Sequence, residues 1–287
     1  MSEQAPPRVL VFDSGVGGLS VADCIHRQLP GLDIVYLADN AGFPYGEKSE
    51  TVVIERCCAL ISRALARYPS EVIVVACNTA STVVLPHLRA MTPVPVVGVV
   101  PAIKPAAAKT VNRRVGLLAT PATVRRPYLD RLVEEFAGDC NVERIGHPGL
   151  VRWAEDLVSG HPVPLAELDE AMAPFRGTGV DTVVLGCTHY PLILESLKLS
   201  LPDVRFWVDS GEAIARRVVW LLEQAGQLSA ARRPVSGAGF PPVTAALFSG
   251  PAPKGIVSFM TGLGVVPRLV AEHWPGDFPE ATAAVSV

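Results

Sequence analysis

Short, almost purely apolar runs recur along the chain and alternate with longer stretches in which apolar residues return every three or four positions. The longer stretches are typical of amphipathic helices, as between Leu19 and Leu29, where Ala22 and Ile25 share a face with both ends. The short runs are typical of strands that are buried on both faces of a parallel sheet. The expected strands are RVLVF from residue 8, DIVYLAD from 33, EVIVVA from 71, VPVVGVV from 94, RVGLLA from 114, DTVVLG from 181 and VRFWVD from 204.

The alternation of strands and helices predicts an α/β fold, and two pairs of similar segments predict that the fold is duplicated. VLVFDSGVGG begins at residue 9 and VGLLATPATV at residue 115, and each reads as a strand, a tight turn and a helix start. VVACNTAST begins at residue 74 and VVLGCTHYP at residue 183, in the same order and at a similar offset. The pattern predicts two similar parallel-sheet α/β domains related by pseudo-symmetry, with the active site between them.

The end of the chain has a different texture. From residue 226 the sequence GQLSAARRPVSGAGFPPV is rich in Pro, Gly and Ser, which is typical of a loop. TAALFSG from residue 244 and GIVSFMTGLG from residue 255 are expected to form a last strand and a last helix, and the tail from residue 279 is expected to be mobile.

Composition narrows the class of partner. The formal net charge of the 287 residues is −3, 18% are charged, and no run of like charges occurs, which argues against nucleic acid and membrane surfaces. A small acidic or zwitterionic ligand is compatible with this balance. Pro, Gly or a charge interrupts every apolar run before it could span a bilayer, and the opening MSEQAPPR lacks the pattern of a secretion signal. A cytoplasmic location is therefore expected.

The cysteines are the candidate chemistry. Reduced thiols are expected in a cytosolic chain, and the absence of a CxxC pair weakens zinc and thioredoxin interpretations. Most cysteines are small buried hydrophobes, and Cys57 lies on an apolar helical face with Val53, Leu60 and Ile61. The core interpretation is preferred for Cys24, Cys57, Cys58 and Cys140.

Cys77 and Cys187 differ, because each ends a strand and is followed at once by polar residues. The pairs that follow, Asn78-Thr79 and Thr188-His189, and the dipole of a helix starting there would favour a thiolate. His189 could tune the neighbouring thiol, orient a ligand or cap a helix, since histidine exchanges protons near neutral pH. A Cys-x-His pair without further ligands is poor evidence for zinc, so no metal site is expected.

Two loops offer ligand contacts with competing explanations. DSGVGGLS from residue 13 could bind an anion or a ligand carboxylate, but Ser20 stands where a dinucleotide loop has its third glycine or alanine. Asp39 could mimic a ribose-binding acid and keeps the nucleotide alternative open. Asp13 could relay protons near a thiol or could simply cap a helix. The Pro44-Tyr45-Gly46 turn could close over a ligand or could be an ordinary β-turn.

Four motifs in order, VFDSGVGGLSV, PYGEKS, VVACNTAS and LGCTHYP, resemble the cofactor-independent aspartate/glutamate racemase family over most of residues 8 to 225. The resemblance implies interconversion of L- and D-glutamate without pyridoxal phosphate or another cofactor, supplying D-glutamate for peptidoglycan synthesis. It also implies that the chain returns to its first domain after VDSG. The expected domains are therefore residues 1–98 with 209–287, and residues 99–208.

The same resemblance implies roles for individual residues. Cys77 and Cys187 would be the two catalytic acid/bases, with Asp13 assisting the first thiol and His189 the second. Glu155 is the best match for an acid near the second thiol, although Asp156 is adjacent and the alignment leaves both open. The implied substrate contacts are Asp13, Ser14, Tyr45, Gly46, Asn78, Thr79, Thr188 and His189.

Two departures from the family pattern stand out. Ala38-Asp39-Asn40 replaces a Gly-Asp-Thr sequence, and His147-Pro148 replaces Cys-Pro. Three alternatives stay open: a racemase of aspartate or a hydantoin, a nucleotide or small-anion binding protein, and a redox dithiol protein. The favoured partner is a small molecule, glutamate, and a homodimer is left open.

Overall fold

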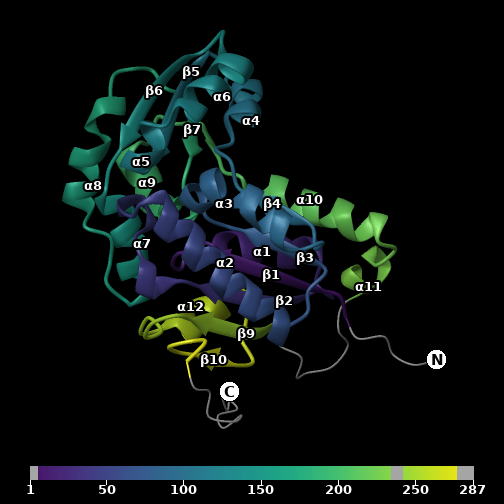
Figure 1. Ribbon diagram of the computed structural model, residues 1–287. Coiled ribbons are helices and arrows are strands. Elements are labelled where there is room, and N and C mark those ends of the chain that lie inside the picture. The colour runs from purple at the N-terminus through teal and green to yellow at the C-terminus, as the bar shows by residue number, and fades with distance from the viewer. Residues whose placement is uncertain (1–5, 234–241, 277–287) are drawn as a thin grey trace. The chain divides into compact units, whose positions relative to one another are not determined.

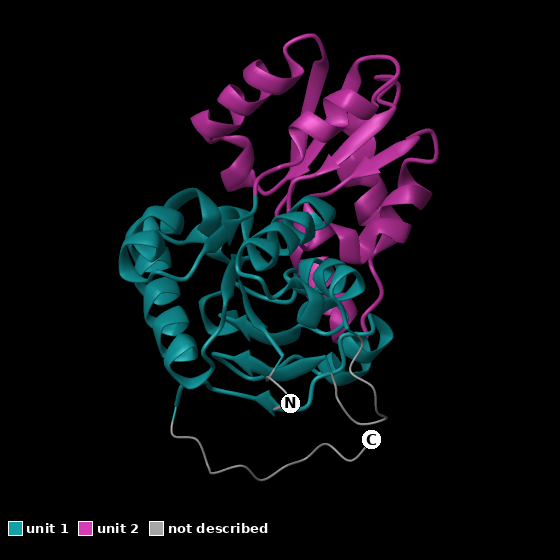
Figure 2. Cartoon of the chain, turned by 90° about the vertical axis from the view of Figure 1, so that its right-hand side faces the viewer, with its two compact units in different colours: residues 1–99, 211–287 teal, residues 100–210 magenta. Residues whose placement is uncertain are grey.

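The computed structural model describes residues 6–233 and 242–276, and its fold is the expected parallel α/β class (Figure 1). The chain divides into two compact units, of residues 1–99 with 211–287 and of residues 100–210, called unit 1 and unit 2 below (Figure 2). Each unit has its own sheet, and every pair of neighbouring strands in both sheets is parallel.

The sheet of unit 1 has the strand order β10-β9-β2-β1-β3-β4. Five of the six residues of its central strand β1 are buried, four of them apolar, which requires cover on both faces. The bounds are β1 (Arg8–Asp13), β2 (Asp33–Ala38), β3 (Val72–Val75), β4 (Val96–Gly98), β9 (Val243–Phe248) and β10 (Val270–Ala271).

Helices cover both faces of this sheet. Leu10 and Phe12 of β1 belong to the cluster with the buried faces of α2 (Glu50–Arg67) and α3 (Asn78–Met91), which pack against each other (Figure 1). The alternate positions Val9 and Val11 are equally buried, so the other face is covered too. There α1 (Leu19–Gln28) packs against α10 (Gly211–Gln224). Among the described residues of unit 1, the other helices are α11 (Leu228–Arg232), α12 (Ile256–Gly262) and the 3₁₀-helices η1 (Asn40–Gly42) and η2 (Tyr45–Glu47).

The sheet of unit 2 has the order β6-β5-β7-β8. One face is covered by α4 (Ile103–Lys109) and α6 (Pro127–Ala137), whose buried residues cluster with Leu117 and Val184. The strands are β5 (Arg114–Ala119), β6 (Asn141–Gly146), β7 (Thr182–Leu185) and β8 (Phe206–Val208). The other helices are α5 (Pro121–Val124), α7 (Gly149–Val158), α8 (Leu165–Met172), α9 (Leu194–Ser200) and the 3₁₀-helices η3 (Ala173–Phe175) and η4 (Tyr190–Ile193).

The expected duplication is visible in the topology of the two sheets. The order β2-β1-β3-β4 in unit 1 corresponds strand for strand to β6-β5-β7-β8 in unit 2. Phe12 pairs with Val75 in the first sheet, and Leu118 pairs with Leu185 in the second. Cys77 and Cys187 therefore each lie two residues beyond an equivalent register position, at the carboxyl end of an equivalent strand.

The structure contains elements that the apolar pattern does not predict, and two expected segments lie partly or wholly outside the described residues. Strand β6 was not expected, because its residues Val142, Glu143 and Arg144 are only partly buried at the edge of the sheet and show no continuous apolar run. The stretch from residue 226, expected as a loop, contains helix α11, and its residues 234–241 lie outside the described part of the chain. The tail expected to be mobile also lies outside it.

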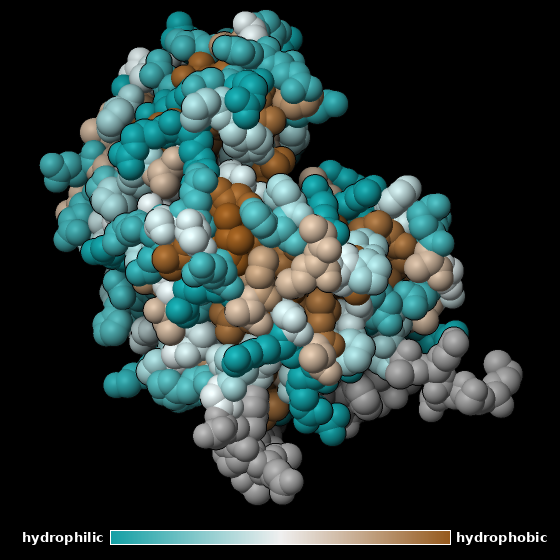
Figure 3. Space-filling model, viewed as in Figure 1, coloured by the Kyte–Doolittle hydropathy of each residue, from teal (hydrophilic) through white to brown (hydrophobic). Residues whose placement is uncertain are grey.

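The surface agrees with the interrupted apolar pattern of the sequence. On the face drawn in Figure 3, hydrophilic residues cover much of the outer helices of both units. Large hydrophobic side chains with high exposure are scattered, such as Val111 in unit 2 and Trp220 on α10. Within residues 6–233 and 242–276, no helix combines the length and apolarity that crossing a membrane would need.

Candidate active site

The polar residues singled out in the sequence gather at the carboxyl ends of the strands in each unit, where ligands of open α/β sheets bind. In unit 1 they include Ser14, which contacts the Cys77 sulfur, and in unit 2 they include His189, which contacts the Cys187 sulfur. We call these groups the first thiol site (Asp13, Ser14, Cys77, Asn78 and Thr79) and the second thiol site (Glu155, Cys187, Thr188 and His189). All of these residues are buried except Glu155, which is partly exposed.

The first thiol site is built where β1 and β3 end side by side. Cys77 precedes the first residue of α3, so its sulfur lies near the amino end of a 14-residue helix. The positive end of the helix dipole favours a thiolate at such a position. Ser14 Oγ lies 3.7 Å from Cys77 Sγ, within hydrogen-bonding distance of a sulfur. The hydroxyl of Ser14 is thus one polar group that the structure places against this thiol.

Asp13 holds the loop that leads into α1. Its carboxylate accepts the backbone N–H of Ser14 through Oδ1 and that of Gly18 through Oδ2, both at 2.7 Å. A side chain at Gly18 would bring a Cβ within 2.9 Å of Asp13 Cβ, so glycine permits this closure. Asp13 therefore braces the turn before α1 and does not cap the helix, because the N-cap residue is Gly18 and no side chain caps this end.

The second thiol site is a linear chain of three side chains. Cys187 Sγ lies 3.6 Å from His189 Nδ1, and His189 Nε2 lies 2.8 Å from Glu155 Oε1. The neighbouring Asp156 is exposed on α7, so the structure resolves the ambiguity between the two acids in favour of Glu155 as the partner of His189. A carboxylate that orients an imidazole, which in turn contacts a sulfur, is the arrangement that activates a nucleophile or base.

The protonation state of His189 depends on its hydrogen-bonding partners, Cys187 and Glu155. Burial alone would lower the pKa of His189, but hydrogen bonds to Cys187 and Glu155 and the negative charges of both outweigh burial and raise this pKa well above its ordinary value. The cationic imidazole can therefore persist at neutral pH beside the sulfur.

One expectation about the second thiol was wrong. A helix dipole was expected behind both cysteines, but Cys187 is followed by a turn and the short 3₁₀-helix η4. The Pro at position 191 and the tight Cys187-Thr188-His189 turn prevent an α-helix from starting directly at the thiol. The second thiol thus lies beside the imidazole of His189, whereas the first lies near a helix end.

Asp39 is not available to bind a ribose. Its carboxylate is fully buried, and its two oxygens accept hydrogen bonds from Arg56, Tyr45 and Ser249. The nucleotide-binding interpretation depended on Asp39 as a ribose-binding acid, and these contacts remove that support. Neither Arg56 nor Ser249 was singled out in the sequence, because they lie 17 and 210 positions from Asp39 and no local pattern links them.

Tyr45 was expected to contact substrate together with Gly46. The structure buries the Tyr45 side chain and directs its hydroxyl to Asp39 Oδ2 at 2.6 Å. Gly46 is exposed next to it. A ligand contact of the Tyr45-Gly46 pair would therefore come from its backbone.

The departure at His147 has a structural explanation. The His147 ring packs on Trp153 with 5.3 Å between the ring centroids, and its Nδ1 accepts the backbone N–H of Gly149 at the start of α7. It orients the helix that carries Glu155.

The four other cysteines differ in burial. Cys24 and Cys57 are buried as expected, but Cys58 and Cys140 are only partly buried, because each lies toward the edge of its hydrophobic cluster.

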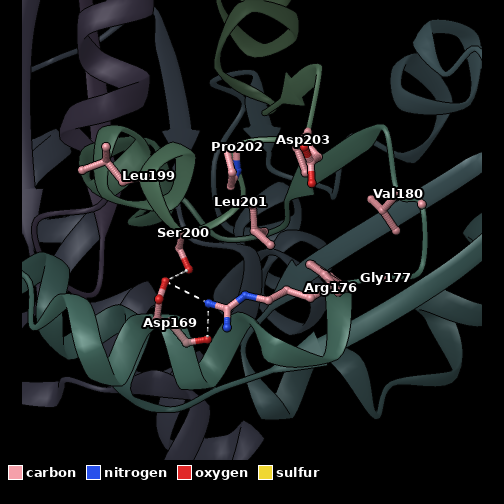
Figure 4. A pocket seen from close by; sticks show the side chains of 12 residues that line it. Asp169, Arg176, Gly177, Val180, Leu199, Ser200, Leu201, Pro202 and Asp203 are labelled. Carbon is pink, nitrogen blue, oxygen red and sulfur yellow. Dashed lines mark hydrogen bonds and ion pairs between the residues drawn. The ribbon is translucent and has the colours of Figure 1, made fainter.

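A separate hollow of about 580 Å³ opens in unit 2 (Figure 4). Its lining includes Val180 and Val204, which precede β7 and β8, so it lies at the amino ends of these strands, away from Cys187. Arg176 in this hollow is already paired with Asp169, whose carboxylate also accepts a hydrogen bond from Ser200 Oγ.

In the described part of the chain, no group of three or more His, Cys, Asp or Glu is placed to hold a metal ion.

Comparison with known proteins agrees with the motifs. A family model described as Asp/Glu/Hydantoin racemase matches residues 9–218. A glutamate racemase of Klebsiella pneumoniae (strain 342) is 54% identical over 219 residues, which cover 76% of this chain and 77% of the relative.

Solved structures match over nearly the whole chain. The glutamate racemase of Escherichia coli, solved with L-glutamate and the activator UDP-MurNAc-ala, has a TM-score of 0.83 and 45% identity, covering 93% of this chain and 98% of that one. The glutamate racemase of Francisella tularensis, solved with D-glutamate, has a TM-score of 0.71 and 26% identity, covering 93% and 97%.

Proposed function

The chain belongs to the Asp/Glu/Hydantoin racemase family, and from this premise we propose that it is a glutamate racemase in which Cys77 and Cys187 act on opposite faces of the substrate α-carbon. The observation that carries the proposal is the pair of cysteines at equivalent strand ends, each with polar partners in hydrogen-bonding distance. Relatives named glutamate racemase, solved with L-glutamate in one case and D-glutamate in another, support the choice of substrate.

Inversion of an α-carbon needs a proton removed on one side and a proton supplied on the other. One cysteine, as thiolate, takes the α-proton and becomes a thiol, while the other thiol gives its proton to the opposite face and becomes a thiolate. The enzyme ends with its two protonation states exchanged, so the reverse reaction uses the same pair with opposite roles. Such general acid–base catalysis contributes about 10²- to 10⁴-fold.

The two thiols have different support for their charged forms. The amino end of α3 and the Ser14 hydroxyl stabilise the Cys77 thiolate, and Asp13 fixes the loop that carries Ser14. Glu155 orients His189, which lies beside the Cys187 sulfur and can accept or return a proton. A reversible racemase requires that each thiol can serve in turn as the base.

The carbanion that develops at the α-carbon needs donors in a site with little water. Asn78, Thr79 and Thr188 are buried next to the two sulfurs in sequence and supply amide and hydroxyl donors. Asp13, Ser14, His189 and the backbone at Tyr45 and Gly46 complete the proposed substrate contacts. No step in this scheme needs pyridoxal phosphate. The product, D-glutamate, would serve peptidoglycan synthesis in the cytoplasm.

The substrate assignment predicts a clear preference between homologous amino acids. We expect the purified full-length chain, without added cofactor, to racemise D- and L-glutamate with a kcat/KM about 10- to 200-fold above that for aspartate, because the side chains differ by one methylene. Polarimetric assays with both enantiomers of each amino acid, and with a substituted hydantoin, measure this. Faster turnover of aspartate or of the hydantoin would reassign the substrate within the family.

A further inference from the structure

An ionic cluster around a buried carboxylate, with Arg56 partly exposed, lies beside the first thiol site and takes no part in the proton transfers above. We call it the Asp39 clamp and define it as Asp39, Tyr45, Arg56 and Ser249. Arg56 donates from Nε to Asp39 Oδ2 and from Nη2 to Oδ1, both at 2.6 Å. Tyr45 donates its hydroxyl to Oδ2 at 2.6 Å, and Ser249 donates its hydroxyl to Oδ1 at 2.5 Å.

Each oxygen of the Asp39 carboxylate thus has two donors, one of them charged. The side chain of Asp39 is 0% exposed, and a buried carboxylate is tolerated only with such pairing. Burial, followed by the charges of Cys57 and Asp39, raises the pKa of Tyr45, so its hydroxyl stays protonated and acts as a donor. Both oxygens of the Asp39 carboxylate therefore have their hydrogen-bond donors, and these bonds hold the side chains of the clamp in one arrangement.

The backbone next to the clamp places Asp39 at the end of β2 and leaves room for the hydrogen bonds of its carboxylate. Asp39 directly follows β2, and its N–H donates to Asp13 O at 2.8 Å, so the clamp extends the β1–β2 ladder. A Cβ at Gly42 would lie 2.5 Å from Asp39 Oδ2 and 2.7 Å from Arg56 Nε. Only glycine at this position lets the guanidinium and the phenol reach the same carboxylate.

Two distant elements are tied to the turn through the clamp. Ser249 follows β9 and accepts the N–H of Ala41 at 3.0 Å in addition to its bond with Asp39. Gly250 N donates to Asn40 Oδ1 at 2.8 Å, and Asn40 Nδ2 donates to Pro251 O at 2.5 Å. Arg56 comes from α2 on the other side. The segment from Asp39 to Tyr45 is therefore held by both β9 and α2.

We propose that Arg56 and Ser249 are positioning residues for substrate binding, which act by fixing Tyr45 and so presenting the exposed backbone of Gly46. This inference rests on the proposed function, because that function makes the Tyr45-Gly46 turn a substrate contact. The clamp works at a distance from the proton transfers: it sets how well glutamate is held and leaves the chemistry at Cys77 and Cys187 unchanged.

The test compares Ser249→Ala with the conservative Ser249→Thr, which keeps a hydroxyl. Arg56→Lys is a second variant, since lysine keeps the charge but loses the two-pronged contact with Asp39. The matched control is Ser200→Ala, because Ser200 also donates to a carboxylate, Asp169 Oδ1, at 2.6 Å, but at the hollow in unit 2. Two readouts are taken: steady-state kinetics with each glutamate enantiomer, and amide hydrogen exchange of residues 40–48 without substrate.

We expect Ser249→Ala to raise KM for both enantiomers about tenfold, a change of about 1.4 kcal/mol in binding. The expected kcat stays within about twofold with an unchanged pH profile, and exchange in residues 40–48 becomes about tenfold faster. Ser249→Thr should restore both readouts, Arg56→Lys should resemble Ser249→Ala, and Ser200→Ala should match the wild type.

Unchanged KM and unchanged exchange in Ser249→Ala would overturn the proposal, as would a shifted pH profile of kcat, which would place the cluster in proton transfer. Faster exchange with an unchanged KM would also overturn it, since the clamp would then serve stability alone. Failure of the wild-type chain to act on glutamate would instead refute the proposed function, and the exchange readout would still decide whether the clamp fixes the turn.

Discussion

Replacing Cys77 or Cys187 with alanine is expected to abolish racemisation of glutamate and to leave the fold intact. Each substitution removes the only group proposed to exchange a proton on one face, so the rate should fall by at least about 10²- to 10⁴-fold in both directions. Both side chains are small and buried, and truncation removes a single sulfur, so the expected loss of stability is about 1 kcal/mol. Circular dichroism of the amino acid measures racemisation, and thermal unfolding measures stability.

Cys140→Ala is the matched control, because this thiol is partly buried in unit 2 and has no proposed role. It should keep full activity. A single Cys→Ser variant should lose racemisation yet still eliminate a leaving group from the β-carbon of a substituted glutamate, because elimination needs one base only. Full racemase activity in either Cys→Ala variant would rule out the two-base scheme.

The second large effect is expected at His189. The His189→Asn variant should lower kcat about 10²-fold, since the Cys187 thiolate loses both its cationic neighbour and its proton partner. In the wild type the folded-state pKa of His189 is raised, so its stabilising contribution is fully present below the unfolded-state value of 6.5. The contribution is lost as pH rises through the folded-state pKa.

Glu155→Gln keeps the size of the side chain but removes the charge that helps to raise the pKa of His189. The alkaline loss of activity and of stability should therefore move to lower pH in this variant. Asp156→Asn is the control on the same helix, because Asp156 is exposed and should leave the profile unchanged. A pH profile of Glu155→Gln identical to that of the wild type would show that Glu155 does not act through His189.

The sequence predicts those parts of the fold that depend on continuous burial. Strands β1, β3, β5 and β7 each contain a continuous apolar run and were expected, whereas β6 is an edge strand with polar residues and no such run. The thiols could be singled out because each breaks an apolar run with a cysteine and polar residues.

Other features depend on contacts that no local pattern carries. Glu155 and Asp156 are equivalent in sequence, and only the direction of each side chain from α7 shows that Glu155 meets His189. The partners of Asp39 come from α2 and from the end of β9, so a residue that resembled a ribose-binding acid is instead a paired, buried charge. The α-helix expected directly after Cys187 does not form, because a tight turn and a proline follow the thiol. The spacing of apolar residues does not reveal this turn.

Solvent deuterium tests most directly whether one sulfur acts on each face of the α-carbon. In D₂O at early times, each glutamate enantiomer should give a product of opposite hand that carries deuterium at the α-carbon, while the recovered substrate keeps its protium. This result follows because the proton removed by one thiolate is not the one returned by the other thiol. Deuterium entering the recovered substrate as fast as it enters the product would mean that a single base serves both faces, and would contradict the two-cysteine mechanism.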